Sequence, residues 1–212
     1  MPRAALSPDA VVALALRLVD EEGPDALTLS AVAGRAGVAT PSLYKHIRGL
    51  AELRGLVSGR VLAELTEIAA EAALGRSGDD ALRALMDGWR AYAARHPHRY
   101  SVLVQAPLPE TAEAGERLVG VILAALRAYG LEGSAAIHAV RCLRAVTHGF
   151  AVLEAEGAFR LAEDLDESYA LLAHMVVSGL RTARETSTAS TETPGHQALQ
   201  ALSPPSTELS KH

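Results

Sequence analysis

The chain has 212 residues, 49% of them hydrophobic, which is enough for an ordinary domain with a buried core and a smaller second one. A net charge of −5 argues against indiscriminate nucleic-acid binding, and the single cysteine, Cys142, excludes an intrachain disulfide and favours a reducing compartment. Because we find no signal-peptide pattern and no apolar span of membrane length, we expect a soluble, cytoplasmic protein without a membrane partner.

Abundant alanine and leucine, with few strand-forming residues, predict an all-α fold. The first helix is expected to begin at Ser7-Pro8-Asp9, where a hydroxyl caps the N-terminus and proline occupies the first turn. It should run to about Glu22 and stop at Gly23-Pro24, after which Thr28 is expected to cap a second helix.

Residues 29–47 predict two short helices joined by a tight turn, which is a helix-turn-helix. Gly37 ends the first of these helices, and Thr40 as N-cap with Pro41 at the first helical position starts the second. Apolar residues recur at helical spacing on the inner face. Four polar or aromatic side chains are left facing outward on the second helix: Ser42, Tyr44, Lys45 and His46.

The charge changes sign at this motif. Residues 1–34 hold two basic and five acidic side chains, whereas residues 35–60 hold one acidic side chain, Glu52, and five basic ones: Arg35, Lys45, Arg48, Arg54 and Arg60. Such a local basic surface is expected where a protein contacts DNA phosphates. We therefore expect the second helix to enter the major groove of double-stranded DNA. A purely structural helical hairpin is the alternative.

A long amphipathic helix is expected from about Leu50 to Leu74, connecting this motif to the rest of the chain as a lever. After a loop at 75–78, with Asp79 as cap, further helices are predicted at 79–95, 110–129, 134–156 and 167–184. The Thr-, Ser- and Pro-rich remainder predicts disorder. Three parts result: a helix-turn-helix DNA-binding domain (1–49), a helical ligand-binding and dimerisation bundle (50–184) and a disordered tail (185–212).

The 134–156 helix presents two stripes of interest beside a part-polar one that contains Ile137, Arg141, Arg144, His148 and Ala151. An apolar stripe expected to face the core contains Ala139, Leu143, Val146, Phe150 and Leu153. A stripe of small side chains that allows close approach of another helix contains His138, Cys142, Ala145, Gly149 and Val152. The second stripe fits a dimer interface built from the last two long helices, and it fits tight packing inside one subunit equally well. One helix-turn-helix makes few DNA contacts, so a homodimer on a palindromic operator is expected.

The middle helices carry residue types expected of a small-molecule pocket. The candidate apolar and aromatic lining is Met86, Trp89, Tyr92, Tyr100, Leu103, Phe150 and Met175, and the candidate polar groups are Gln105, Arg141 and His148. Tryptophan and tyrosine at helical spacing are also what an ordinary core contains, so a packing role stays open.

Catalytic chemistry has little support in this sequence. We find no nucleophile elbow, no phosphate-binding glycine loop and no dinucleotide fingerprint, and we predict neither enzymatic activity nor a cofactor. His96-Pro97-His98 is better explained as a solvated helix junction than as a metal site, since no other ligand has suitable spacing. The acidic residues between Glu154 and Glu167 are better explained as a solvated loop and helix cap than as paired catalytic carboxylates.

The stretch from Thr28 to Ile47 (TLSAVAGRAGVATPSLYKHI) resembles the N-terminal signature of the tetracycline-repressor-like transcriptional regulators, a resemblance that covers about residues 7–60. More loosely, His148-Gly149, Glu154 and the helix start at 163–167 resemble one ligand-binding C-terminal subclass of that family, which carries a His-Gly motif.

The resemblance implies roles for individual residues. Tyr44, Lys45 and His46 would contact the DNA backbone, as would Thr28, while base reading would fall to Thr40, Pro41 and Ser42. Many members have lysine where this chain has Leu50, and Arg48 or Arg54 can replace that phosphate contact.

Together these observations predict a ligand-responsive DNA-binding transcriptional regulator, most simply a repressor released from its operator by a small molecule. The alternative is a helical small-molecule-binding or enzymatic bundle whose helix-turn-helix is purely structural.

Overall fold

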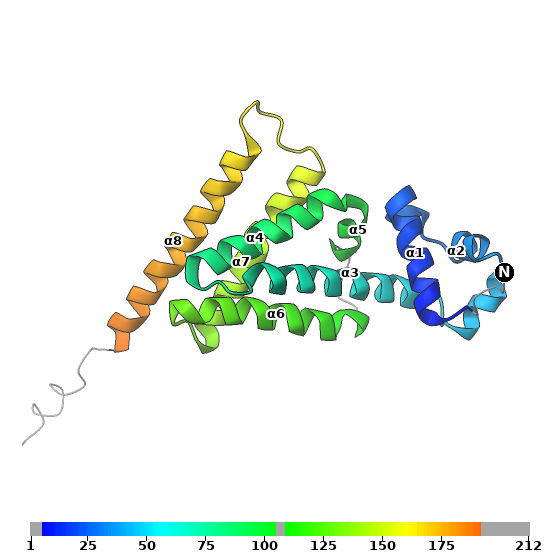
Figure 1. The fold of residues 1–212 in the computed structure, drawn as a ribbon, viewed down its shortest axis with the longest axis horizontal. Helices are drawn as coiled ribbons and strands as arrows, with labels where there is room; N and C mark the ends of the chain where they lie inside the picture. Colours follow the sequence, from blue (N-terminus) through cyan, green and yellow to red (C-terminus); the bar gives the residue numbers. More distant parts are fainter. Residues whose placement is uncertain (1–5, 105–108, 192–212) are drawn as a thin grey trace, which may run out of the picture.

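The computed structural model describes residues 6–104 and 109–191, and all regular structure within these ranges is helical. Figure 1 shows a small N-terminal unit at one end, formed by α1 (Pro8–Glu22), α2 (Leu29–Ala36) and the 3-10 helix η2 (Thr40–Lys45). The long helix α3 (Leu50–Ala73) runs from this unit into a helical bundle. The predicted all-α fold is confirmed.

The bundle surrounds the C-terminal part of α3. It contains α4 (Gly78–Arg95), α6 (Ala112–Leu126) and α7 (Gly133–Ala155), while α8 (Leu165–Thr191) packs against α4 and α7 and extends beyond them (Figure 1). Short elements connect these helices: η1 (Pro24–Ala26), α5 (Pro97–Ser101), η3 (Val102–Val104), η4 (Pro109–Thr111) and η5 (Arg127–Tyr129).

Local chemistry sets the ends of the first helix as predicted. The Ser7 hydroxyl accepts a hydrogen bond from the amide of Ala10 at 3.1 Å, and Pro8 occupies the first turn, where its missing N–H has no partner to lose. Gly23 ends the helix with φ of +86°, a conformation that is strained for any residue with a side chain, and its amide donates to the carbonyl of Val19 at 2.9 Å.

Helix α3 is buried along one face from the N-terminal unit to the bundle. Leu53, Val57, Val61, Leu65 and Ala69 are all buried, and α3 contacts α1 of the N-terminal unit as well as α4 and α6 of the bundle. All five side chains belong to one continuous cluster of buried residues. The lever predicted between the two parts of the chain is therefore an unbroken helix with a shared core on its inner face.

The start of α4 and the end of α8 differ from the prediction. Ser77, not Asp79, precedes α4, because Asp79 already lies in its first turn, where its carboxylate accepts the Tyr129 hydroxyl at 2.7 Å. Helix α8 continues to Thr191, so residues 185–191 of the expected tail are helical; residues 192–212 lie outside the described part of the chain.

The buried face of α7 is rotated from the expected apolar stripe. Val146 and Phe150 are only half-buried and Leu153 is exposed, while the helix buries Ala136, Ala139, Val140, Leu143, Thr147 and Ala151. The reason is that α4, α6 and α8 all contact α7, so its inner face is set by three neighbours and not by hydropathy alone.

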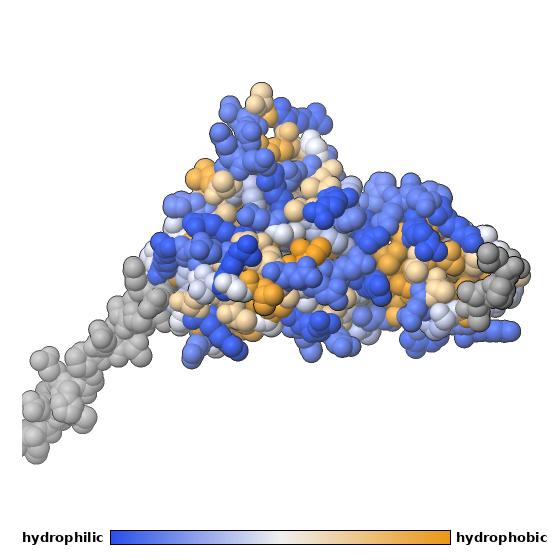
Figure 2. Space-filling view, viewed as in Figure 1, coloured by the Kyte–Doolittle hydropathy of each residue, from blue (hydrophilic) through white to orange (hydrophobic). Residues whose placement is uncertain are grey.

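The surface in the view of Figure 2 is mostly hydrophilic, with small apolar patches over the bundle and the N-terminal unit. Within residues 6–104 and 109–191, no single helix has the length and hydropathy of a membrane span. The segments Pro109–Tyr129 and Gly133–Ala155 meet these criteria only as a pair, and that pair is bent by 115°.

Candidate nucleic-acid interface and ligand cavity

The tight turn between α2 and η2 is built by local hydrogen bonds. Thr28 caps α2 by accepting the amide of Ala31 at 3.1 Å, as predicted. Gly37 ends α2 in the left-handed conformation with φ of +65°, and the amide of Val38 then donates to the carbonyl of Ala33 at 3.1 Å. This pattern reverses the chain within two residues and fixes the direction of the second helix.

The start of the second helix differs from the prediction. Ala39 is its last extended residue, with φ of −73° and ψ of 143°, and Thr40 is already inside the helix, so the Thr40 side chain is not the N-cap. No side chain caps this end; instead, the carbonyl of Ala39 accepts the amide of Ser42 at 2.8 Å, within a six-residue 3-10 helix. Pro41 follows in the first turn, where it is tolerated.

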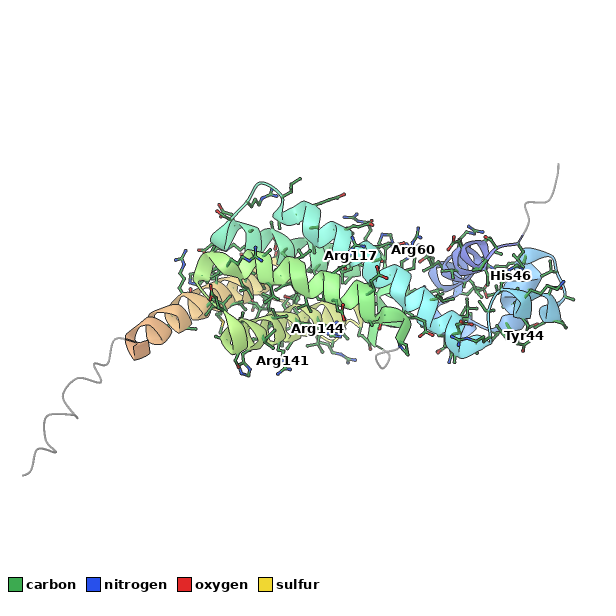
Figure 3. All side chains as sticks on the ribbon, turned by 90° about the horizontal axis from the view of Figure 1, so that it is seen from below. Tyr44, His46, Arg60, Arg117, Arg141 and Arg144 are labelled. Carbon is green, nitrogen blue, oxygen red and sulfur yellow. The ribbon has the colours of Figure 1, made fainter. Side chains whose placement is uncertain are left out.

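The outward face of η2 is free to meet a partner. Leu43 and Ile47 are buried and anchor the helix to the N-terminal unit. Tyr44 is 57% exposed, and Lys45 and Pro41 are exposed as well. Thr40, Ser42 and His46 are half-buried at the margin of the same surface. Figure 3 places Tyr44 and His46 at the end of the molecule farthest from the bundle.

Ion pairs divide the basic residues of this unit into two groups. Arg35 is held by Glu21 and Glu22, each at 2.6 Å, and Arg48 by Glu52 at 3.0 Å. Glu52 also accepts the backbone amide of Arg48, and this hydrogen bond is the main reason that its pKa lies below the ordinary value. Neither Lys45 nor Arg54 has an acidic partner within 4.0 Å among the residues that the structure describes.

A cavity of about 430 Å³ lies between α3, α4, α6 and α7. Its apolar wall includes Leu62 and Leu65 of α3 and Leu118 and Ile122 of α6, and its polar lining is Ser58, Trp89, Tyr100, Thr111, Arg144 and His148. The volume and the mainly apolar lining are typical of small-molecule sites.

Three of the lining side chains form a hydrogen-bonded chain. The indole Nε1 of Trp89 donates to the Tyr100 hydroxyl at 2.6 Å, and that hydroxyl lies 2.6 Å from Nδ1 of His148. Burial raises the pKa of Tyr100 to about 12, so the phenol keeps its proton and donates it to His148. Burial, with a smaller effect of Arg144, lowers the pKa of His148 and favours the neutral ring that accepts this bond.

The structure brings together four of the ten residues proposed for the pocket: Trp89, Tyr100, Leu103 and His148. Gln105 lies outside the described residues. The other five do not line the cavity: Met86, Tyr92, Arg141, Phe150 and Met175.

Each of these five has a physical reason for its different position. Met86 and Tyr92 are buried in the packed core, and the Tyr92 hydroxyl donates to Glu64 at 3.0 Å. Phe150 packs against Phe159 and Tyr169 with ring centroids 4.9 Å apart in both pairs. Arg141 and Met175 are exposed.

The sequence pattern did not identify several lining residues. Arg144 takes the place expected for Arg141, one turn further along the same stripe of α7. Figure 3 labels Arg141 and Arg144 close together on the bundle, and Arg141 is the one nearer the N-terminal end of α7. Ser58 of α3 and the lining residues of α6 lie in sequence patterns that predict only a buried helix face. The sequence showed that Arg141 and Arg144 lie on the same face of α7. Which of the two lines the cavity depends on where α6 packs.

Polar contacts of α5 join the bundle to the N-terminal unit. Arg99 of α5 bonds to Asp20 of α1 at 2.9 Å and to Glu64 of α3 at 2.8 Å, and His98 lies 3.2 Å from the carbonyl of Asp20. Separately, η4 packs closely against α3: a Cβ added to Gly59 would lie 2.6 Å from the Glu110 carbonyl oxygen.

Among the described residues no cluster of three metal-binding side chains is present.

Comparison with known proteins agrees with this geometry. The family model described as "Bacterial regulatory proteins, tetR family" matches residues 11–53, and that described as "Tetracyclin repressor-like, C-terminal domain" matches residues 82–176. The uncharacterized HTH-type transcriptional regulator Rv0681 of Mycobacterium tuberculosis is 36% identical over 77% of this chain and 75% of its own. YobS, an uncharacterized HTH-type transcriptional regulator of Bacillus subtilis, is 33% identical over 84% of this chain and 95% of its own.

Solved structures share the fold. Apo ActR from Streptomyces coelicolor superposes with a TM-score of 0.71 at 21% identity, covering 87% of this chain and 99% of that one. The exposed second helix of a helix-turn-helix, joined by α3 to a helical bundle with a cavity, defines a DNA-binding transcriptional regulator. The chain belongs to the tetR family of bacterial regulatory proteins.

Proposed function

We propose that the chain is a cytoplasmic repressor that binds a palindromic operator as a homodimer and leaves it when a small molecule enters the cavity. The observation that carries this proposal is the position of α5. Within its five residues, Arg99 bonds to α1 of the N-terminal unit and Tyr100 lines the cavity. A ligand that displaces Tyr100 therefore acts on the residue next to a link with the DNA-binding unit.

The DNA contacts that we propose follow from exposure and charge. Tyr44, Lys45 and His46 would meet the phosphate backbone, with Thr28 and either Arg48 or Arg54 at its edges. Thr40, Pro41 and Ser42 would meet base edges. These three side chains are short and offer methyl contacts or single hydrogen bonds, so DNA shape and half-site spacing would contribute much of the specificity.

The dimer would form through the last two long helices. The exposed apolar side chains Ile137 and Leu153 of α7 and Leu171 and Met175 of α8 support this interface. The small stripe at His138, Cys142 and Ala145 is also exposed in the single chain, so it is open to a second helix. Close approach of two small-residue faces would bring the α7 and α8 pairs into a four-helix arrangement.

We also propose that the bundle belongs to the subclass marked by His148-Gly149 and that it senses ligands without transforming them. The support is that His148 lines the cavity and accepts a hydrogen bond from Tyr100. An enzymatic bundle with a purely structural helix-turn-helix is the competing function. It predicts turnover of a cavity ligand and no sequence-selective DNA binding.

A shift assay with the DNA upstream of the protein's own gene, against an unrelated DNA of equal length, tests the proposal. We expect selective binding that weakens as salt rises. Replacing both Tyr44 and Lys45 by alanine should abolish binding while the helical content and the dimer persist.

The matched control is Arg127→Ala, which removes an exposed cation at η5, far from the N-terminal unit. It should leave DNA binding unchanged. Equal affinity for both DNAs would reject the proposed function.

A further inference from the structure

The charges around the cavity are unbalanced. Among the described residues that line the cavity, Arg144 is the one formally charged side chain, and neither aspartate nor glutamate occurs. Within the described part of the chain, Arg144 has no carboxylate within 4.0 Å, whereas Arg90 and Arg99 are each held by two. A guanidinium at the wall of an apolar cavity is a strong site for an oxyanion, since it offers paired N–H donors and a permanent charge.

Three of the other polar groups of this wall are engaged with one another. The Tyr100 hydroxyl accepts from Trp89 and donates to Nδ1 of His148, both at 2.6 Å. A ligand that sought a hydrogen bond from the Trp89 indole N–H or the Tyr100 hydroxyl would have to break that chain. Among the described lining residues, Arg144 supplies the permanent positive charge that can meet a charged ligand.

We propose that the cavity takes an apolar monoanion: a hydrocarbon body carrying one carboxylate, with the carboxylate on the Arg144 guanidinium. This inference rests on the proposed function, of which it names the ligand class. The hydrocarbon would lie against Leu62, Leu65, Leu118 and Ile122, which supply the apolar wall. The carboxylate would form an ion pair with the exposed guanidinium of Arg144, whereas a neutral head group forms no ion pair and a cationic one is repelled.

The protein contains a single tryptophan, Trp89, and it lines the cavity. Its fluorescence therefore reports occupancy directly in the full-length protein. Octanoate, octan-1-ol and octylammonium each contain eight carbons in a linear chain with a compact head group, and they differ in head-group charge. We expect octanoate to bind at least about tenfold more tightly than the alcohol, as a charge-assisted hydrogen bond implies, and the cation to bind most weakly.

Arg144→Gln should lower the affinity for octanoate to that for octan-1-ol and leave the affinity for the alcohol unchanged. The matched control is Arg141→Gln, which removes the same charge from an exposed position on the same helix outside the cavity, and it should leave all three affinities unchanged. Equal binding of octanoate and octan-1-ol, no binding of octanoate, or an unchanged affinity in Arg144→Gln would overturn the proposal.

This measurement is independent of DNA. Selective quenching by octanoate in a protein that binds no operator would reject the proposed function and leave the ligand class standing. Operator binding without any change of Trp89 fluorescence on adding octanoate would reject the ligand class and leave the proposed function standing.

Discussion

Arg99 and Asp20 connect the sensing bundle to the first helix of the DNA-binding unit, with Nε of Arg99 donating to Oδ1 of Asp20 at 2.9 Å. The same guanidinium donates to Glu64 of α3 at 2.8 Å. The next residue, Tyr100, is buried in the cavity wall. Three helices and the cavity therefore meet at two consecutive residues of α5.

The first prediction concerns this junction. Arg99→Gln should leave octanoate binding at Trp89 unchanged but reduce the effect of octanoate on operator affinity. Coupled sites typically change each other's affinity by about 5- to 150-fold, and this factor should fall toward one in the variant. Operator titrations with and without octanoate measure it.

Arg35→Gln is the control for that experiment, because it removes an arginine whose ion pairs with Glu21 and Glu22 stay within the N-terminal unit. It should retain the wild-type coupling factor. If both variants lose the effect of octanoate on operator affinity equally, the Arg99–Asp20 contact does not couple the cavity to the DNA-binding unit.

The second prediction concerns the close contact between α3 and η4. A Cβ at Gly59 would lie 2.6 Å from the backbone oxygen of Glu110, which cannot move without displacing η4. We expect Gly59→Ala to lower the free energy of unfolding by about 1–3 kcal/mol, as overpacking does. Urea unfolding followed by circular dichroism measures the change.

Gly120→Ala provides the comparison, since this glycine lies inside α6 with nothing within 4 Å of an added Cβ. There alanine should stabilise the protein by about 0.5–1 kcal/mol through helix propensity. Stabilisation by both substitutions would show that η4 adjusts freely and that the contact carries no strain.

The third prediction concerns pH. Burial, with Arg144 contributing less, holds the pKa of His148 below 6.5 in the folded protein. The neutral ring thus adds stability that is complete above the unfolded pKa of about 6.5 and is lost as the pH falls through the lower folded pKa. In that window the free energy of unfolding should fall by at most about 1.4 kcal/mol per pH unit on account of this residue.

His148→Gln keeps an acceptor for Tyr100 but does not titrate, so its stability should fall less steeply than that of the wild type below pH ~6.5. Urea titrations between pH 5 and 8 measure the difference. His138→Gln, an exposed position on the same helix, should retain the wild-type slope. Parallel curves for wild type and His148→Gln would contradict the assignment.

The fourth prediction concerns the dimer. Met175 is 62% exposed on α8, in a position suited to a partner subunit. Met175→Glu would place a charge in an apolar interface, and we expect the chain to become monomeric in light scattering and to lose operator affinity. Leu74→Glu changes a residue that is 80% exposed at the end of α3 and should remain dimeric. A dimeric Met175→Glu protein would place the interface elsewhere.

Features set by neighbours in the chain were predictable from sequence. The caps at Ser7 and Thr28 and the left-handed Gly37 depend on contacts within four residues, and the structure has all three. Thr40 failed as a cap because the helix began one residue earlier, a shift that a Thr-Pro pair does not determine.

The cavity was less predictable because it depends on how four helices are rotated against one another. Arg141 and Arg144 share a stripe of α7, and only the position of α6 decides which of them reaches the cavity. Phe150 fits a pocket by residue type, yet Arg90, Phe159 and Tyr169 surround it elsewhere. Residue types in the sequence indicate that a small-molecule cavity is present, whereas the rotation of the helices decides which residues line it.

The continuity of the buried cluster along α3 also bears on how the protein folds. Leu53, Val57, Val61 and Leu65 are buried on successive turns of one helix, which contacts α1 of the N-terminal unit and α4 and α6 of the bundle. Neither unit can lose its share of α3 without exposing the apolar face of the other. The two are therefore expected to unfold in a single cooperative transition, and a segment ending at residue 49 would lack the side chains that close its own core.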